Sequence, residues 1–443
     1  MEVTLRKAGD VYLNFQAPPS KSYTHRALIA ASLALGDSII TNPLEAEDIA
    51  ATRAALVGMG VQIMEGDRCS RVRGTGGTLS CAPGLVMDMQ NSGTSMRLLT
   101  SVALLCKSPV VLTGSPRMKE RPLGPLADAL TALGGRIEFM EKAGFPPVKV
   151  SGRLTGGRAR VDAGMSSQFV SSILMAAPYA HRDVILDLDP GVASPSYLDV
   201  TLSVMEAFGA TVEREGYRRF QVAAGIPYRA RTYEIEGDYS SASYFFALAA
   251  LCGGRVRVGN LNPTSCQGDR RFLAALESMG CRVSTPRESV EVSCDGDLDG
   301  IEIDMSSSPD TVQTLCMVAA KARSPTRISG IAHLKWKESD RLESTTRLLR
   351  SLGGDVTVEG DALIIRPAPL HGGRIDPGDD HRTAMSFTVL GLSMGNVKIT
   401  QAECVSKSCF DYVVYPSPLL FGKSVFAFVL FWIGKIVCCM GHI

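Results

Sequence analysis

Residues 18–36, PPSKSYTHRALIAASLALG, place a cluster of small polar and charged residues directly before an apolar helix rich in alanine and leucine. The pattern returns five more times at intervals of about 70 residues, which indicates a repeated architecture. The other clusters are QNSGTSMR (90–97), MSSQF (165–169), DYSSAS (238–243), SSSPD (306–310) and GDDHR (378–382). The predicted helix starts are Ser22, Ser92, Ser167, Ser241, Ser308 and Asp380. A helix start presents backbone N–H groups and the positive end of the helix dipole, so each can bind an anion.

A second pattern runs in phase with the first: a helix that closes on glycine, followed by β-branched residues that favour a strand, as in ALTALGGRIEF (129–139). Glycine at the closing position suits a left-handed C-cap. The closing glycines are Gly60, Gly134, Gly209, Gly280 and Gly353. The two patterns together predict an α/β protein of six repeats, each with two helices interleaved with strands.

The bulk composition limits the function. The net charge of the 443 residues is only +1, so nucleic acid and anionic membranes are not expected as general partners. The twelve cysteines form no CxxC or Cys/His ligand spacing, and residues 1–15 lack the apolar core of a secretory signal. P-loop, GxGxxG, HExxH and EF-hand motifs are absent from the sequence. We therefore expect a cytoplasmic protein that requires no metal and no cofactor.

The length exceeds what one hydrophobic core usually serves, so two or more domains are expected. The best boundaries are two short passages, at residues 17–19 and 226–235, where one set of three repeats would meet the other. The prediction is a discontinuous first domain, 1–17 plus 236–412, a second domain, 18–235, and a separate tail, 413–443.

Charged residues within the clusters indicate chemistry. Lys21, Ser22 and Arg26 lie within one and a half helical turns and can converge on one phosphate, although a capped helix with a solvated basic flank explains them equally well. Helix capping similarly explains Ser166, Ser167 and Ser194. The cations at or beside the clusters are Lys21, Arg26, Arg97, Arg121, Lys337, Arg341, Arg382 and Lys407. Eight such cations in a nearly neutral protein predict a cleft for ligands that carry several negative charges.

Two stretches contain candidate acid and base groups. Asp310 follows Pro309 at a helix start, where it is either a general base or simply a favourable first-turn residue. In WKESDRLE (336–343), Lys337 and Arg341 are spaced i,i+4, which predicts that they share one face of a helix. The fourth cluster, at 238–243, has no cation, and we assign it a structural role.

The motifs themselves carry a family resemblance. PPSKSYTHRALIAASLALG, QNSGTSMRLL, SPRMKERPLGPLADAL, SSQFVSSILMAAP, EGDYSSASYFFALAAL, WKESDRLE and DDHRTAMSF resemble the motif set of the 5-enolpyruvylshikimate-3-phosphate (EPSP) synthases, in the family's order over residues 1 to 412. The resemblance implies an inside-out α/β barrel of six βαβαββ-type units, three per domain, which close over shikimate 3-phosphate and phosphoenolpyruvate. It also implies a monomeric enzyme of the shikimate pathway to chorismate and aromatic amino acids.

The same resemblance assigns roles residue by residue. The implied catalytic groups are Asp310 as proton acceptor, Glu338 as the carboxylate that protonates the enol methylene, and Lys21. The implied shikimate 3-phosphate residues are Lys21, Ser22, Arg26, Ser166, Ser167, Gln168, Ser194, Asp310 and Lys337. The implied phosphoenolpyruvate residues are Lys21, Gly93, Arg121, Gln168, Arg341, Arg382 and Lys407.

The sequence departs from the family's pattern at several positions. His333 stands where the family often has Asn, Cys409 loosens the alignment around Lys407, and Leu98 stands where some relatives have Pro, so glyphosate sensitivity stays open.

Two rival functions are the sister enzyme acting on UDP-N-acetylglucosamine and a non-catalytic anion-binding protein. The first is opposed by the lack of a cysteine in SPRMKERP, and the second by the joint presence of Asp310, Glu338 and the eight cations.

The tail differs in kind from the rest of the chain. Residues 425–440 are apolar except for Gly434 and Lys435, which is shorter than the usual membrane span of about 20 residues. A readthrough-like extension without function, an additional packing or partner contact, and a membrane anchor are the three interpretations, in that order of preference.

Overall fold

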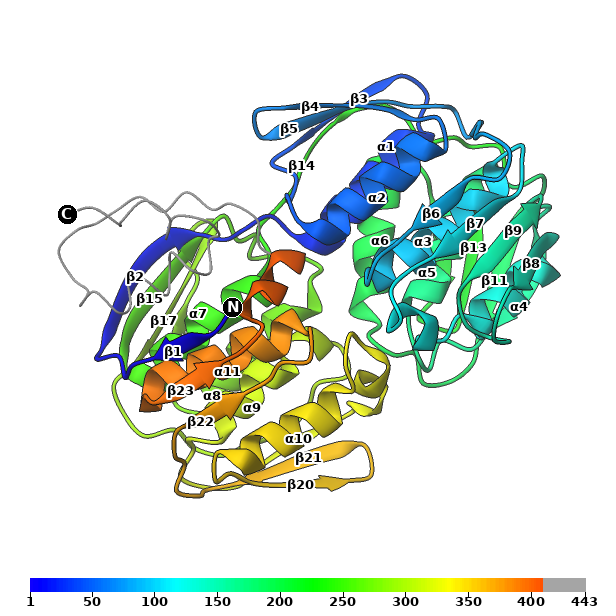
Figure 1. Ribbon diagram of the computed structural model, residues 1–443. Helices are drawn as coiled ribbons and strands as arrows, with labels where there is room; N and C mark the ends of the chain where they lie inside the picture. Colours follow the sequence, from blue (N-terminus) through cyan, green and yellow to red (C-terminus); the bar gives the residue numbers. More distant parts are fainter. Residues whose placement is uncertain (409–443) are drawn as a thin grey trace. The chain divides into compact units, whose positions relative to one another are not determined.

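The computed structural model describes residues 1–408 and divides into two compact units (Figure 1). Unit 1 is Met1–Pro18 together with the chain from Glu236 onward, and unit 2 is Pro19–Ile235. One hydrophobic core lies wholly within unit 2, and a second lies wholly within unit 1. Each unit therefore has the apolar interior that an independent domain needs.

Unit 2 contains three repeats. Its helices are α1 (Lys21–Leu33), α2 (Glu47–Gly58), α3 (Gly93–Val102), α4 (Gly124–Ala132), α5 (Gln168–Ala176) and α6 (Ser196–Ala207). Its strands are β3 (Asp37–Thr41), β4 (Gln62–Gly66), β5 (Cys69–Arg73), β6 (Val86–Asp88), β7 (Val110–Thr113), β8 (Gly135–Phe139), β9 (Val148–Gly152), β10 (Gly157–Val161), β11 (Val184–Leu188), β12 (Val212–Glu215), β13 (Arg219–Val222) and β14 (Thr232–Glu234).

Unit 1 contains the other three repeats. Its helices are α7 (Tyr239–Cys252), α8 (Arg271–Ser278), α9 (Val312–Ala319), α10 (Arg341–Ser351) and α11 (His381–Met394), with 3-10 turns η4 (Gly268–Arg270), η5 (Pro309–Thr311), η6 (Ala332–Trp336) and η7 (Ala402–Lys407). Its strands are β1 (Val3–Leu5), β2 (Val11–Gln16), β15 (Gly254–Gly259), β16 (Arg282–Ser284), β17 (Ser289–Cys294), β18 (Glu302–Asp304), β19 (Thr326–Ser329), β20 (Asp355–Glu359), β21 (Ala362–Arg366), β22 (Gly373–Ile375) and β23 (Val397–Ile399).

The sheets repeat one topology. In the sheet β6-β7-β9-β8, the first two strands are parallel and the other pairings are antiparallel. Four other sheets of the described residues have the same pattern, and the sixth repeat forms the three-stranded sheet β1-β23-β22. The parallel pair in each sheet accommodates a crossover helix, as a βαβ connection requires. The α/β fold of six βαβαββ-type units is thus confirmed.

Two strands close the units. Along the chain β2 directly precedes α1 of unit 2, but β2 pairs in parallel with β15 of unit 1. Likewise β14 leads into α7, yet it pairs in parallel with β3 of unit 2. Each unit therefore completes its three repeats with a strand from a distant part of the sequence, which explains why unit 1 is discontinuous.

The helices that open the repeats form the interior. In unit 1, α7, α9 and α11 contact one another, and α7 also packs on β15 and β17 (Figure 1). These helices are buried on nearly all sides, which their small and apolar residues allow. Buried hydroxyl groups within such helices bond back to the preceding turn; Thr24 of α1, for example, donates to the Ser20 carbonyl at 2.8 Å.

The predicted helix starts and ends are confirmed. Helices begin within five of the six clusters, and the fifth cluster leads into the 3-10 turn η5 before α9. All five closing glycines have a positive φ, between 88° and 107°, and a strand follows each one. Within residues 1–408, none of the helices is both long enough and apolar enough to cross a membrane. The predictions for the tail, 413–443, and for Cys409 lie outside the described residues.

Candidate active site: two sets of charged groups

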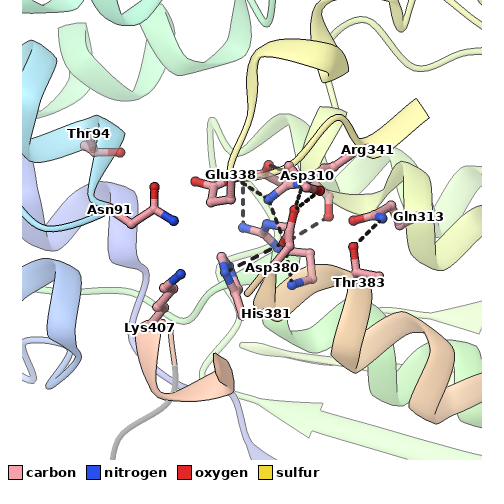
Figure 2. Close-up of polar contacts among 12 residues, drawn as sticks. Asn91, Thr94, Asp310, Gln313, Glu338, Arg341, Asp380, His381, Thr383 and Lys407 are labelled. Atoms are coloured by element: carbon pink, nitrogen blue, oxygen red, sulfur yellow. Dashed lines mark hydrogen bonds and ion pairs between the residues drawn. The ribbon is translucent and has the colours of Figure 1, made fainter. Parts of the chain in front are cut away.

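Unit 1 holds a cluster of charges around Arg341, whose side chain is only 1% exposed. Its guanidinium donates to three carboxylates: Asp310 Oδ1 at 3.0 Å, Glu338 Oε2 at 2.6 Å and Asp380 Oδ2 at 2.9 Å (Figure 2). Burial lowers the pKa of Arg341, but the three carboxylates raise it by more than burial lowers it. The net result is a pKa above the ordinary value of an arginine. Arg341 is therefore a permanent cation that organises the site.

Asp310 is bound from two sides. Arg382 donates to Asp310 Oδ2 at 2.9 Å, while Arg341 occupies Oδ1. The Arg382 guanidinium also donates to the Tyr244 hydroxyl at 3.3 Å. Because each carboxylate oxygen has two lone pairs, Asp310 can still accept a proton while both arginines hold it.

The WKESDR stretch does not form one helix. Lys337 lies after η6 with an extended backbone, and α10 begins only at Arg341. The prediction that Lys337 and Arg341 share a helix face is therefore wrong, because the Asp340 side chain caps α10 through the N–H groups of Leu342 and Glu343 and so stops the helix there. Glu338 reaches Arg341 from this irregular segment, outside the helix.

Further groups of unit 1 support the cluster. Asp380 caps α11 by accepting from the Arg382 N–H at 3.0 Å, in addition to binding Arg341. The Lys407 ammonium, in η7, donates to the Asp379 carbonyl at 2.7 Å and to its carboxylate. Asp379 and Asp380 thus fix one cation each, a role that their sequence position beside His381 did not indicate.

Unit 2 holds the first predicted cations. Lys21 opens α1 and its ammonium donates to Asp48 Oδ2 at 2.9 Å. Arg26 is almost fully buried; it donates to Thr201 Oγ1 at 2.7 Å and to the Ser22 carbonyl at 3.0 Å. Burial lowers the pKa of Arg26 to about 10, so the group is still charged at neutral pH. Lys21 and Arg26 therefore bind different groups of the protein and share no partner among these contacts.

The start of α3 carries the next groups. The Gln168 side chain connects it to α5: Arg97 donates to Gln168 Oε1 at 2.8 Å, and Gln168 Nε2 donates to Thr94 Oγ1 at 3.0 Å. Arg121 donates to the Asn91 carbonyl at 3.1 Å, and its guanidinium lies against Gly93. A Cβ atom at position 93 would lie 2.4 Å from an Arg121 nitrogen, which explains the glycine there.

The predicted serines have local roles as well. Ser166 Oγ accepts from the Gln168 N–H at 3.3 Å, near the start of α5. Ser167 is buried and its side chain makes no capping bond. Ser194 is buried with φ at 55°, a left-handed conformation that is uncommon for serine, two residues before α6. The helix-cap explanation therefore fits Ser166 and does not fit Ser167.

Two buried acids, Asp238 and Asp269, interact electrostatically with Arg382, and the sequence did not indicate them. Asp238 caps α7 through the Ser241 N–H at 3.1 Å, and burial raises its pKa. Asp269 accepts from Ser240 Oγ, and burial together with the charge of Asp310 raises its pKa to about 7. The structural role expected for the fourth cluster agrees with the Asp238 cap.

His333 departs from the family's pattern in residue type but not in charge. Burial, followed by the nearby Lys337, lowers its pKa to about 3. His333 is therefore neutral at pH 7 and offers the hydrogen bonds of an uncharged side chain, as Asn would.

Four of the eight predicted cations are paired with carboxylates, which the sequence patterns did not indicate. Lys21, Arg341, Arg382 and Lys407 each bind a carboxylate. The eight cations predicted a cleft for ligands that carry several negative charges, and the structure places an acidic neighbour beside each of these four. Cations and carboxylates in contact suit a reaction that must bind anions and also transfer protons.

Six repeats in two units, with cations and carboxylates gathered at the helix starts, define a two-domain α/β enzyme for anionic substrates, of the enolpyruvyl transferase type. The chain belongs to the EPSP synthase (3-phosphoshikimate 1-carboxyvinyltransferase) family, whose family model matches residues 5–414. It is accordingly a transferase of the shikimate pathway, which moves the enolpyruvyl group of phosphoenolpyruvate to the 5-hydroxyl of shikimate 3-phosphate.

Relatives match nearly the whole chain. A 3-phosphoshikimate 1-carboxyvinyltransferase of Methanoculleus marisnigri is 59% identical over 408 residues, which cover 92% of this chain and 97% of the relative. An enzyme of the same name from Yersinia pseudotuberculosis is 40% identical over 414 residues, covering 93% and 96%. The solved EPSP synthase of Acinetobacter baumannii has a TM-score of 0.75 and 29% identity, with 92% of this chain and 95% of that chain covered.

Proposed function

We propose that the chain catalyses its family's transfer with the two sets of charged groups described above, one from each unit. In unit 1, Asp310 accepts the proton of the 5-hydroxyl of shikimate 3-phosphate, and Glu338 donates a proton to the methylene carbon of phosphoenolpyruvate. Arg341, Arg382 and Lys407 bind the anionic groups of phosphoenolpyruvate, and Lys337 binds shikimate 3-phosphate.

In unit 2, Lys21 takes part in binding both substrates and in catalysis. The residues proposed for shikimate 3-phosphate are Ser22, Arg26, Ser166, Ser167, Gln168 and Ser194. The residues proposed for phosphoenolpyruvate are Gly93, Arg121 and Gln168. The buried contacts of Arg26, Gln168 and Arg121 support this assignment, because they hold the donors in fixed orientations before any substrate binds.

The chemistry requires these residue types. Protonation of the methylene carbon leaves C2 electron-poor, and the 5-hydroxyl oxygen adds there while losing its proton, which gives a tetrahedral ketal phosphate. Inorganic phosphate then leaves with its C–O bond electrons, and the methyl group returns one proton to yield the enol ether. A base, an acid and fixed cations for the leaving phosphate are all needed.

The observation that carries the proposal is the position of Asp310 between Arg341 and Arg382. The Arg341 guanidinium, which donates to Asp310, also donates to Glu338 Oε2 at 2.6 Å. An acid–base pair and two anion-binding arginines therefore share one connected set of hydrogen bonds in unit 1.

The test measures phosphate release from phosphoenolpyruvate plus shikimate 3-phosphate by purified protein. The Asp310→Asn variant should lose about 100- to 10,000-fold in kcat, the usual effect of removing an acid–base group. Arg341 still has Glu338 and Asp380, so the fold should survive the change. Asp299→Asn, at an exposed pair with Arg323, is the matched control and should behave as wild type. Full turnover in Asp310→Asn would exclude Asp310 as the base.

We further propose that the enzyme is a cytoplasmic monomer whose domains are 1–17 plus 236–412 and 18–235. The separate core of each unit supports the domain assignment, and the absence of a CxxC or Cys/His ligand spacing among the twelve cysteines of the sequence is as expected in a reducing compartment. Light scattering on the purified protein tests the monomer, and fractionation of cells tests the compartment.

A further inference from the structure

Unit 2 contains a buried network of hydrogen bonds that the proposed reaction does not use. His25 Nδ1 lies 2.8 Å from Thr52 Oγ1, and Thr52 Oγ1 lies 2.7 Å from Ser95 Oγ. Ser95 Oγ in turn lies 3.1 Å from the Asp48 carbonyl oxygen and 2.7 Å from Ser92 Oγ. His25, Thr52, Ser92 and Ser95 are fully buried.

The directions of these hydrogen bonds follow from one fixed acceptor. The Asp48 carbonyl can only accept, so the single Ser95 hydroxyl proton is donated to it. Ser95 Oγ must then accept from Thr52, whose only hydroxyl proton is thereby used. His25 Nδ1 must therefore be the donor to Thr52, which fixes the Nδ1–H tautomer of a neutral imidazole. The pKa of His25 is lowered by burial and by nearby Lys21 and Arg26, in agreement with a neutral imidazole.

The network connects three helices at the ends that carry substrate groups. His25 lies one turn after Lys21 on α1, and Thr52 lies one turn after Asp48 on α2. Asp48 holds the Lys21 ammonium at 2.9 Å. Ser92 is the N-cap of α3 and accepts from the Ser95 N–H at 3.3 Å, directly before Gly93.

We propose that His25, in its Nδ1–H tautomer, is a positioning residue: through Thr52 and Ser95 it fixes the distance between Lys21 and the start of α3. It contacts no substrate itself. Its effect on the reaction rests on the proposed function, in which Lys21 and Gly93 both bind phosphoenolpyruvate.

Two pairs of variants test the network. Thr52→Val removes the hydroxyl with little change in shape, and Thr52→Ser keeps it. His25→Leu removes the donor, and His25→Asn keeps a donor near the place of Nδ1. Thr52→Val and His25→Leu should raise the KM for phosphoenolpyruvate ~10-fold with kcat changed less than ~3-fold, because a displaced binding group weakens binding of that substrate. Thr52→Ser and His25→Asn should stay within ~2-fold of wild type.

This split between KM and kcat separates positioning from simple stability. Loss of stability lowers the fraction of folded enzyme and so reduces the apparent kcat, but leaves the KM of the folded fraction unchanged. An unchanged KM in Thr52→Val, or a His25→Asn variant as impaired as His25→Leu, would overturn the proposal.

The tautomer has a readout that needs no activity. In ¹⁵N-histidine-labelled protein, the signals missing from the His25→Asn spectrum identify His25, and their shifts distinguish the two neutral tautomers. The Nδ1–H form is expected, and an Nε2–H form would overturn the proposal. If the wild-type protein releases no phosphate from the two substrates, the proposed function fails, and the spectrum still decides the direction of the network.

Discussion

Substitution of Gly93 by alanine tests the proposed binding of phosphoenolpyruvate, and the displacement that it causes can be calculated from the structure. The Cβ atom that Gly93→Ala introduces would lie 2.4 Å, 2.5 Å and 2.7 Å from three atoms of the Arg121 guanidinium. Ordinary contact begins at 3.4 Å, so the guanidinium must move by about 1 Å. Arg121 is 3% exposed and bonded to the Asn91 carbonyl, so it cannot move without disturbing that bond.

The expected result is a rise in the KM for phosphoenolpyruvate of about 10- to 100-fold, equivalent to about 1.4 to 2.8 kcal/mol of binding. The KM for shikimate 3-phosphate should change little, because Arg121 is assigned to the other substrate. Stability should fall by at most about 1–2 kcal/mol, because the displaced Arg121 loses its buried hydrogen bond to the Asn91 carbonyl, and the higher helix propensity of alanine offsets only part of this loss. Steady-state phosphate release, with each substrate varied in turn, measures both constants.

Gly9→Ala is the matched control, because a Cβ atom there meets no atom within 4 Å and both constants should stay at wild-type values. A Gly93→Ala enzyme with an unchanged KM for phosphoenolpyruvate would show that Arg121 does not bind that substrate. An equal rise in both constants would instead show that the substitution disturbs unit 2 as a whole.

Three further predictions concern stability and the tail. Arg341→Met should destabilise unit 1 by about 3–5 kcal/mol in urea unfolding, because Asp380 is fully buried and would lose its cation, whereas Arg347→Ala, an exposed pair on the same helix, should cost at most about 0.5 kcal/mol. Equal losses in the two variants would refute the role of burial. Burial lowers the pKa of His333 from 6.5 to about 3, so between these values the unfolded chain binds a proton that the folded chain does not, and stability falls as the pH drops below 6.5. His333→Asn should reduce this fall by up to about 1.4 kcal/mol per pH unit, and an identical pH profile would contradict it. A chain ended after Tyr412 should keep the kcat/KM of the full chain, because every residue assigned a role precedes that point; a loss of activity would assign a function to the tail.

The repeated fold could be predicted because it depends on local patterns. Closing glycines such as Gly134 mark helix ends through their positive φ, and the clusters mark helix starts through polar residues that compete with the helix. Both signals act within a few residues of the chain. The pairing of β2 with β15 and of β14 with β3 joins distant segments, and no local pattern in the sequence indicates it.

The residue types of the candidate site could be predicted from the sequence, but the contacts between its residues could not. Lys21 and Arg341 could be recognised as cations at helix starts, whereas Asp48 lies 27 residues from Lys21 and Asp380 lies 39 residues from Arg341. An ordinary first-turn acid such as Asp48 gives no sign of a partner on another helix. Lys337 was misplaced because i,i+4 spacing was assumed to mean a helix, although Asp340 is itself a helix cap and excludes one continuous helix there.

The missed residues have one physical property in common. A cation that must hold a phosphate has to be fixed before the substrate arrives, and a long side chain is fixed best by groups that balance its charge. Asp48, Asp379 and Asp380 do this for Lys21, Lys407 and Arg341, respectively. In the proposed function, the incoming anion shares cations that are already oriented, so binding orders fewer side chains than it would with unpaired lysines and arginines. The pairing of these three cations with carboxylates is what such preorganisation requires, and it is compatible with a protein whose net charge is only +1.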